Sequence, residues 1–511
     1  MGILTRLRAA RDVCEQWIPW AALAALGAVT IWTRLPGALR DPLWADEVYS
    51  ARTIIAPSTH EALHRVAMES SPPGWFFLGR LLHQAGAAPD AMRLLSVALS
   101  VALTIFVFVY ARRMLPLWGA VVAGTIAALG NQLVVHGREM RPYELMALLA
   151  VVLALVLEAA VAAPTRRRLG ALAGTVLLGS MTHYFFLLPV FTGLVWLWTL
   201  AGAAGRRLRV SLAIGAGLVP LLLWLPVTLR QAGRVNQYFS GFRKRGVANL
   251  YSDLLASQAV WRRTDYNWRL VVVALVLAGA VVVARRPVGR LVALMAVLPV
   301  VLTAIVWFLG LNVFNMRNLI VVAPFVAIAL AAVPSILPKP AALIASVAMI
   351  GAIGWIYSVQ AQRERTPLDE VAQSVVQLGW TDNDPILFVG NPRNQRSALG
   401  WALPGHPQLG DATFNGRPCS RIFVVAESRA APAWLQEHAG SVVAQRSFPF
   451  YGHGPYGLRQ PYDVLVADLR WPTGFPAAGT PPGGTLFFYS RSGPVPSCLS
   501  PRPLHEPLSL F

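Results

Sequence analysis

The octapeptide Leu43-Trp44-Ala45-Asp46-Glu47-Val48-Tyr49-Ser50 follows the first long apolar run of the chain, residues 17–33. It carries two adjacent carboxylates in a protein with only 24 aspartate and glutamate residues among 511. Ionisable groups close to a bilayer are unfavourable unless they serve a function. The octapeptide therefore indicates chemistry at a membrane surface, and the apolar run before it indicates that the chain enters the membrane.

The composition of the whole chain supports a membrane protein. Hydrophobic residues make up 55% of the sequence, charged residues make up 13%, and the mean hydropathy is +0.52. These values are typical of a polytopic membrane protein. A net charge of +20 would favour nucleic acid as a partner. The arginines, however, lie in short groups between apolar runs, as in cytoplasmic loops of membrane proteins, so no nucleic acid partner is expected.

Apolar runs recur throughout the first 360 residues, and a helix needs about 20 residues to cross the bilayer core. The run over residues 169–200 is too long for one upright helix. If it forms two helices that turn at Thr182-His183-Tyr184, the arginine groups on both sides of it face the cytoplasm, as the positive-inside rule favours. We therefore expect about eleven spans. The runs cover residues 17–33, 94–110, 115–135, 142–163, 169–200, 210–229, 270–284, 291–311, 319–333 and 341–357.

The basic N-terminus is expected to lie in the cytoplasm, because Arg6, Arg8 and Arg11 precede the first span and no convincing cleavage site follows it. The C-terminal domain is then periplasmic or extracellular. Frequent arginine, alanine and glycine are typical of GC-rich bacterial genomes, so the expected location is a bacterial inner membrane. The external segments would be residues 35–93, 136–141, the turn at 183, 230–269, 312–318 and everything after about 358.

The external loop over residues 230–269 is rich in arginine, which violates the usual charge bias. Anionic ligands and the headgroups of anionic lipids explain this charge equally well. Both alternatives remain open at the level of sequence.

The domain boundary is expected near residue 360, between a transmembrane domain (1–360) and a small external α/β domain (361–511). Short β-rich segments alternate there with turn residues, which predicts strands over 385–389, 421–425, 463–466 and 485–489. Helices are predicted over 369–378 and 432–438. No nucleotide-binding motif is present. Cys419 and Cys498 can pair if this domain lies in an oxidising compartment.

The residues of the outer segments match the minimum needs of glycosyl transfer outside the cytoplasm. A base must take a proton from the acceptor, and cations must hold a departing phosphate. Asp46 would be the base, and Arg138, Arg141 and Arg317 would be the cations. A metal is not expected, because Asp46 and Glu47 have no further ligands at metal-binding spacing; a divalent cation there is only a weak alternative.

Each of these residues also has a structural explanation. Asp46 can be the N-cap of a helix over residues 47–55. Arg138 and Arg141 can extend from helix ends to the membrane interface. His183 can be a packed, hydrogen-bonded histidine, and the turn over residues 70–73 can simply start a helix.

Six motifs resemble those of the GT-C fold glycosyltransferases of the protein O-mannosyltransferase and aminoarabinose transferase superfamily. Within it, the chain looks like the bacterial dolichyl-phosphate-mannose-protein-mannosyltransferase-like group. The resemblance covers roughly two thirds of the chain and excludes the C-terminal domain. Its motifs are Trp44-Ala45-Asp46-Glu47, Ser71-Pro72-Pro73, Arg93-Leu94-Leu95-Ser96, Arg138-Glu139-Met140-Arg141-Pro142-Tyr143, Thr182-His183-Tyr184-Phe185, and Arg317-Asn318-Leu319 with Pro324.

The resemblance implies an inverting transfer of sugar from a polyprenyl-phosphate donor to an external glycolipid, glycan or protein, such as lipopolysaccharide. It implies that Asp46 is the catalytic base and Glu47 its partner. Arg138, Arg141 and Arg317 would bind the donor phosphate. Further candidates for substrate binding are Tyr143, His183, Tyr184 and Ser71. The chain departs from the family pattern in having Ser71 where many members have histidine, and Asn318 where many have tyrosine.

Two other functions are consistent with the sequence. Glu144 and Glu158, which lie inside predicted spans, would suit a transporter or a lipid flippase. Transporters place such residues at mid-membrane depth and often contain repeats, whereas the polar motifs here gather at one face and no repeat is evident. A catalytically inactive scaffold that binds cell-wall material is the other alternative.

Overall fold

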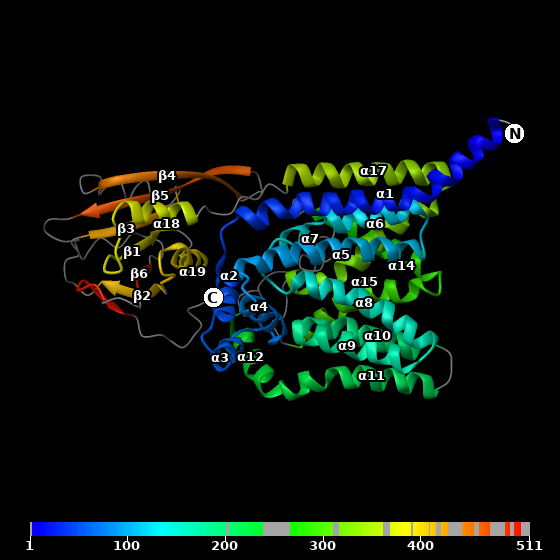
Figure 1. Ribbon diagram of the computed structural model, residues 1–511, viewed down its shortest axis with the longest axis horizontal. Helices are drawn as coiled ribbons and strands as arrows, with labels where there is room; N and C mark the ends of the chain where they lie inside the picture. Colours follow the sequence, from blue (N-terminus) through cyan, green and yellow to red (C-terminus); the bar gives the residue numbers. More distant parts are fainter. Residues whose placement is uncertain are drawn as a thin grey trace. The chain divides into compact units, whose positions relative to one another are not determined.

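The chain forms two units in the computed structural model (Figure 1). The first unit comprises Met1–Leu39 and Thr53–Ala361, and the second comprises Arg40–Arg52 and Gln362–Phe511. The octapeptide that carries Asp46 thus groups with the C-terminal residues, although it is far from them in sequence. The structure describes residues 3–200, 204–238, 266–309, 316–360, 368–389, 392–407, 409–414, 421–427, 442–453, 459–470, 486–490 and 495–501.

The first unit is built from long apolar helices that run alongside one another (Figure 1). Within the described residues, six helices are long and apolar enough to cross a membrane, or seven if one bent pair counts as a span. Three apolar helices are shorter. The predicted number of about eleven spans stays a prediction. The principal helices are α1 (Ile3–Arg40), α5 (Met92–Arg112), α6 (Leu117–Leu129), α8 (Tyr143–Ala162), α14 (Tyr266–Ala284), α15 (Gly289–Phe308), α16 (Ala323–Ala332) and α17 (Lys339–Gln360).

Helix α16 lies in the centre of this unit, since all of its residues are buried. It is rich in alanine, and small residues allow helix backbones to approach closely within a membrane protein. Gly279 of α14 uses this space, because a Cβ atom there would overlap the backbone of Ala329. The 3-10 helix η4 (Met316–Val322) leads directly into α16, so Arg317 is held at the end of the most buried segment. A second 3-10 helix, η5 (Val333–Ile336), follows α16.

The apolar run over residues 169–200 forms two helices, as the charge pattern predicted. Helix α9 (Arg166–Thr182) ends before His183, whose backbone is extended, and η2 (Tyr184–Phe186) then leads into α10 (Leu187–Thr199). Gly179 makes the turn possible, because a Cβ atom there would overlap the ring of Phe186.

The run over residues 210–229 is not one continuous helix, contrary to the sequence interpretation. Helix α11 (Ala204–Leu223) and helix α12 (Leu225–Tyr238) are bent by 64° at Trp224. Pro220 and Pro226 flank the bend, and each lacks the backbone N–H that a helical hydrogen bond needs. Sequence hydropathy does not register this break because the residues on both sides are apolar.

Short helices follow α1, and one more lies between α6 and α8. Ser58 caps α3, since its hydroxyl accepts a hydrogen bond from the Glu61 N–H at 3.1 Å. Arg80 donates to the carbonyls of Ile54 and Ala56, which ties α4 to the end of α2. These helices are α2 (Ala45–Ile54), α3 (Thr59–Met68), α4 (Gly74–Gln84), η1 (Pro89–Ala91) and α7 (Asn131–His136).

The second unit contains a seven-stranded mixed sheet with strand order β4-β5-β3-β1-β6-β2-β7. The four strands predicted from sequence lie at β1, β3, β5 and β6, with β1 and β3 parallel. Strands β2, β4 and β7 were not predicted, because polar residues interrupt their apolar pattern. The strands are β1 (Ile386–Val389), β2 (Leu409–Phe414), β3 (Arg421–Glu427), β4 (Val442–His453), β5 (Arg459–Arg470), β6 (Leu486–Ser490) and β7 (Leu499–Pro501).

Two helices pack on this sheet around a small apolar core. Helix α18 (Leu368–Gln377) corresponds to the predicted helix over 369–378, whereas α19 (Pro392–Ala402) was not predicted. Val371, Phe388 and Phe423 are buried in the core. The other predicted helix, over residues 432–438, lies outside the described residues.

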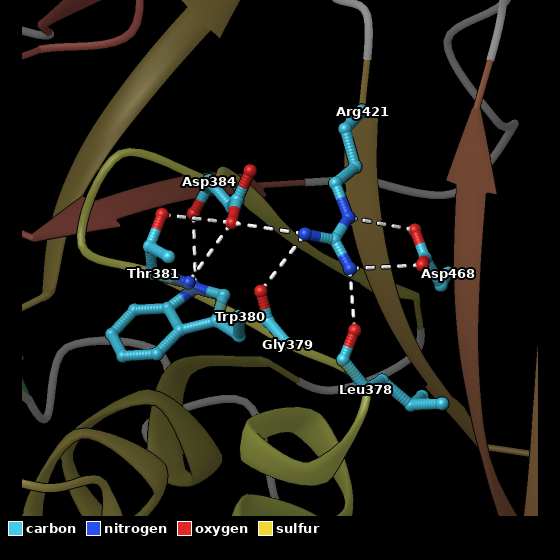
Figure 2. A network of polar contacts seen from close by, with 7 residues as sticks. All are labelled: Leu378, Gly379, Trp380, Thr381, Asp384, Arg421 and Asp468. Atoms are coloured by element: carbon cyan, nitrogen blue, oxygen red, sulfur yellow. Dashed lines mark hydrogen bonds and ion pairs between the residues drawn. The ribbon is translucent and has the colours of Figure 1, made fainter.

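Arg421 joins α18 to the sheet at the edge of this core (Figure 2). Its guanidinium binds both carboxylate oxygens of Asp468 on β5, at 3.0 and 2.9 Å. It also donates to the carbonyls of Leu378 and Gly379, where α18 ends and the backbone of Gly379 is left-handed. A cation at a helix C-terminus is favourable, so this arginine has a structural role.

Cys498 takes part in a disulfide bond. Its proposed partner, Cys419, lies outside the described residues, so the predicted pairing of the two stays a prediction.

Candidate functional site

The two carboxylates of the octapeptide occupy different environments at the start of α2. Glu47 is fully buried, and its carboxylate accepts a hydrogen bond at 3.3 Å from the backbone N–H of Trp44, the residue before the helix. This is the return half of a capping box, in which the third helical residue satisfies the N-cap amide. Asp46 is the second residue of the helix and is half-buried. Of the two acids, Asp46 is therefore the more accessible, and Glu47 supports the helix start.

The alternative that Asp46 is the N-cap is wrong. Helix α2 begins at Ala45, two residues before the predicted start, so Trp44 occupies the capping position. The backbone carbonyl of Asp46 accepts a hydrogen bond from Ser50, as expected for a residue inside the helix. A short polar side chain before an amphipathic run is a common N-cap signal, and here the capping box of Glu47 shifted the helix start.

Three of the predicted site residues gather around the ring of a fourth, Tyr143, in the first unit. The guanidinium carbons of Arg141 and Arg317 lie over this ring, at 6.0 and 5.8 Å from its centroid. The ring of His183 lies 5.8 Å away, centroid to centroid. These residues come from the start of α8, from η4 and from the break between α9 and η2. Helix packing thus brings together groups from three distant parts of the chain.

The cluster gathers positive charge beside a neutral histidine. Burial, together with the positive charges of Arg141 and Arg317, lowers the pKa of His183 to about 3. The Nδ1 atom of His183 accepts the backbone N–H of Phe185 at 3.3 Å, so the ring carries its proton on Nε2. A neutral His183 offers an N–H donor and adds no charge, which leaves the two arginines as the cations of the cluster.

Arg141 is held by an acid that sequence analysis did not single out. It is 3% exposed, and its guanidinium lies 3.9 Å from the carboxylate of Glu69, at the end of α3. The adjacent carbonyl of Met140 accepts a hydrogen bond from the Trp75 indole at 3.4 Å. Glu69 lies two residues before the motif Ser71-Pro72-Pro73, and this position in the sequence is the signal that could have identified it.

His136 and Glu139 stabilise the segment that carries Arg141 through contacts of their own. Their side chains are 2.7 Å apart, and the His136 ring also packs on Tyr143 at 4.6 Å between centroids. Ser96 of α5 donates to the Glu139 carbonyl at 2.7 Å. Both residues belong to the motif that contains Arg138 and Arg141, but their inward orientation follows from the tight turn between α7 and α8.

Arg138 belongs to the same segment. It is half-buried and within electrostatic reach of Arg34 on α1 and Tyr357 on α17. The structure brings Arg141 and Arg317 together over the Tyr143 ring.

Tyr184 takes part in hydrogen bonds that connect helices. Its hydroxyl bonds to Gln231, and it accepts hydrogen bonds from Trp224 and Thr228 at 3.1 and 3.2 Å. Gln231 in turn donates to the Val66 carbonyl of α3 at 2.9 Å. Tyr184 therefore fastens η2 to the bent helix α12, and Gln231 connects α12 to α3.

Ser71 is buried, and its hydroxyl has no hydrogen-bond partner among the described residues. No contact from Ser71 to the Tyr143 cluster is recorded in the described part of the chain.

The two intramembrane acids differ in environment. Glu158 accepts hydrogen bonds from Tyr110 and Arg113, both at 2.7 Å, so it forms a local ion pair at one end of α8. Glu144 is fully buried at the other end of α8, in electrostatic reach of Arg34. Groups of three or more potential metal ligands do not occur within the described residues.

The relation of Asp46 to the arginines is a prediction that these contacts do not test. Asp46 belongs to the second unit, whereas Arg138, Arg141 and Arg317 belong to the first.

No protein-family model and no curated protein matches this sequence. Among solved structures, the chain is similar to ArnT from Cupriavidus metallidurans in the apo state, with a TM-score of 0.55 and 13% identity over 89% of this chain and 98% of that one. For ArnT bound to undecaprenyl phosphate, the TM-score is 0.51, with 12% identity over 88% and 98% of the two chains.

Similarity to larger proteins covers less of their length. The S. cerevisiae protein O-mannosyltransferase Pmt1-Pmt2 complex matches at 21% identity with a TM-score of 0.33, over 41% of this chain and 33% of that one. The chain thus spans about a third of that relative. It spans 59% of the archaeal oligosaccharyltransferase from Archaeoglobus fulgidus. The likeness to ArnT, which extends over nearly the whole of both chains, shows a shared fold.

Proposed function

We propose that this chain, which has the GT-C fold, is a glycosyltransferase that moves a sugar from a polyprenyl-phosphate donor to an acceptor outside the cytoplasm. The observation that carries this proposal is the pair of guanidinium groups, Arg141 and Arg317, over the ring of Tyr143. A polyprenyl phosphate is an anion held at a membrane surface, and ArnT, which shares the fold, has been seen bound to undecaprenyl phosphate. Arginine suits such a ligand because its planar fork can donate two parallel hydrogen bonds to phosphate.

The arginines would act on the leaving group. As the bond between the anomeric carbon and the phosphate oxygen breaks, negative charge grows on the phosphate, and fixed guanidinium groups stabilise it. Neutral His183 would add an N–H donor without repelling the arginines. Glu69 would orient Arg141 from the opposite side. A phosphate held in this way leaves with its electron pair and needs no separate acid.

Asp46 would act on the acceptor. Its carboxylate takes the proton of an acceptor hydroxyl while that oxygen attacks the anomeric carbon from the face opposite the phosphate. One new C–O bond forms, one C–O bond breaks, and the anomeric configuration inverts, as in inverting glycosidases. Glu47, which caps α2, would keep this helix start in place. The mechanism requires Asp46 to reach a donor held by Arg141 and Arg317.

The test uses membranes that contain the full chain and a labelled polyprenyl-phosphate sugar. Asp46→Asn should lower transfer by about 10³-fold, since a general base contributes that order of rate. Arg317→Ala should instead raise the donor concentration needed for half-maximal transfer. Asp90→Asn is the control, because Asp90 is exposed in η1 and lies outside the proposed site. Normal transfer by Asp46→Asn at normal protein level would disprove the assigned base.

The acceptor belongs to the same proposal. A glycolipid such as lipopolysaccharide, another glycan or a protein would present the attacking hydroxyl. Mass spectrometry of surface glycans, lipids and proteins from cells with and without the chain should show one class that loses a single sugar. No difference in any class would count against a transferase.

A further inference from the structure

The helix that carries Asp46 is attached to the C-terminal part of the chain by Arg52. This residue lies on the last turn of α2, and its Nη2 atom donates to the carbonyls of Pro407 and His406, at 3.1 and 3.4 Å. Both ends of this contact belong to the second unit, which joins Arg40–Arg52 with the C-terminal residues. More than 350 residues therefore separate Arg52 from its acceptors in sequence.

The loop that supplies these carbonyls is held in an unusual backbone conformation. Gly405 and His406 are both left-handed, with φ of 74° and 49°. His406 is the one non-glycine residue with positive φ among the described residues, and such conformations persist only where the surroundings enforce them. The left-handed residues Gly405 and His406 thus lie next to, or supply, the carbonyls that accept hydrogen bonds from Arg52.

Local contacts explain how the loop keeps this conformation. The His406 ring stacks on Trp401 of α19, with centroids 4.3 Å apart and planes 10° from parallel, and its Nδ1 atom bonds to the Trp401 carbonyl. The His406 N–H donates to the Leu403 carbonyl at 3.0 Å. Gly400 allows the chain to return closely, since a Cβ atom there would lie 2.6 Å from the Pro407 carbonyl oxygen. The acceptors of Arg52 are therefore rigidly presented.

Arg52 and Asp46 lie on the same helix, so the contact made by Arg52 can fix the position of the Asp46 carboxylate. Asp46 and Arg52 are six residues apart on one ten-residue helix, which is about 9 Å along its axis. Glu47 caps one end of the helix, and Arg52 binds a rigid loop near the other end. A cation is also favourable near a helix C-terminus. Tilting of α2 at the Arg52 end would displace the Asp46 carboxylate.

We propose that Arg52 and the loop over residues 403–407 form a positioning device. Through it, the C-terminal residues of the second unit orient the Asp46 helix for sugar transfer. This inference rests on the proposed function, in which Asp46 is the base. It also gives the C-terminal unit a role in turnover. Arg52 touches neither donor nor acceptor in this scheme, and it acts only through α2.

The experiment compares Arg52→Gln, Arg52→Lys, His406→Ala and the double variant Arg52→Gln/His406→Ala in the full-length protein. Turnover at saturating donor should fall about 10-fold in Arg52→Gln and His406→Ala, because small misplacements of a catalytic group are costly to rate. Arg52→Lys should recover part of the loss, since an ammonium can still donate to a carbonyl. The double variant should be no slower than the slower single variant, because both changes remove one device.

Two readouts separate positioning from a general loss of structure. Equilibrium binding of the labelled polyprenyl-phosphate sugar should be unchanged in all four variants. Hydrogen exchange of the backbone amides over residues 45–52 should become faster. Arg65→Gln is the matched control, since Arg65 makes a partly exposed ion pair with Glu61 on the neighbouring helix α3. It should change none of the three quantities.

Normal turnover together with normal exchange in Arg52→Gln would overturn the proposal, and so would a parallel loss of donor binding. If the unaltered protein transferred no sugar at all, the proposed function would fail. The exchange measurement would still decide whether Arg52 and His406 hold α2, because it requires no activity.

Discussion

At the scale of single residues, the site is defined by differences between chemically similar side chains. Asp46 and Glu47 are neighbours, yet one is half-buried and the other is fully buried in a capping box. Arg138 and Arg141 are three residues apart, yet Arg141 lies over the Tyr143 ring, whereas Arg138 is in electrostatic reach of Arg34 and Tyr357. Roles in this region therefore follow from the direction of each side chain.

His183 provides a prediction about pH. Its folded pKa of about 3 lies below the ordinary value of 6.5, so between these values only the unfolded chain takes up the proton. The stability that His183 contributes is complete above pH 6.5 and is lost as the pH falls toward 3. The midpoint of thermal unfolding in detergent should thus drop more between pH 7.5 and pH 5 for the unaltered protein than for His183→Gln.

The control for this measurement is His60→Gln, since His60 is exposed at the start of α3. His60→Gln should keep the full pH dependence of the unaltered protein. Equal pH dependence in His183→Gln and the unaltered protein would show that His183 is not held neutral by the fold.

At the scale of elements, the turn between α7 and α8 packs against a buried arginine from α1. Arg34 donates to the carbonyls of Ala127 and Ala128 at the end of α6, at 3.1 and 2.7 Å. Gly137 lies against it, because a Cβ atom at Gly137 would be 2.6 Å from the Arg34 Nε atom and would also overlap Ser100. The turn that leads to Arg138 and Arg141 therefore needs glycine at this position for packing.

Gly137→Ala is expected to destabilise the first unit by about 1–3 kcal/mol, the usual effect of overpacking. A lower thermal unfolding midpoint in detergent would report this loss, and weaker donor binding should accompany it because the turn carries Arg141. Gly174→Ala is the control, since Gly174 lies on α9 and has open space where its Cβ atom would be. A Gly137→Ala protein as stable as Gly174→Ala would show that Arg34 does not pack tightly against this turn.

The bent pair α11 and α12 is held in place by hydrogen bonds to Tyr184. Tyr184 was a candidate for substrate binding, but its hydroxyl is bonded to three side chains of the α12 region. The hydrogen bond from Gln231 to Val66 extends this connection to α3. Interhelical hydrogen bonds of this kind hold helices together in membrane proteins.

At the scale of the whole molecule, the arrangement of the spans assigns each loop to a side of the membrane. The proposed topology puts the start of α11 in the cytoplasm and the region after α12 outside. A reporter that works only in the cytoplasm should therefore be active when it is fused at Gly205. A reporter that works only outside the cytoplasm should be active when it is fused at Gly241. The opposite pattern would place the arginines of the site on the wrong side for the proposed reaction.

The division into two units also belongs to this scale. The helix with Asp46 groups with the C-terminal sheet, whereas the arginine cluster groups with the membrane helices. Because the proposed base belongs to the second unit, turnover should be sensitive to changes in that unit, in line with the role proposed for Arg52.

The sequence alone determined the class of the protein and most of its apolar helices. Length and hydropathy of a run are local properties, and the bilayer imposes a fixed requirement on both. Charge between the runs predicted the break at His183, which the structure contains. Motif resemblance also selected Arg141, Tyr143, His183 and Arg317 before their contacts were known.

Only the tertiary structure decided which of these residues meet. The ring of Tyr143 contacts groups from η4 and from the turn before η2 because buried helices, α16 among them, pack closely, and no local pattern encodes that packing. The capping role of Glu47 and the environment of Tyr184 depend likewise on partners that sequence spacing does not reveal. The hydrogen bonds of Arg52 are the clearest case, since their acceptors are backbone carbonyls, which every residue possesses and whose direction is fixed only by folding.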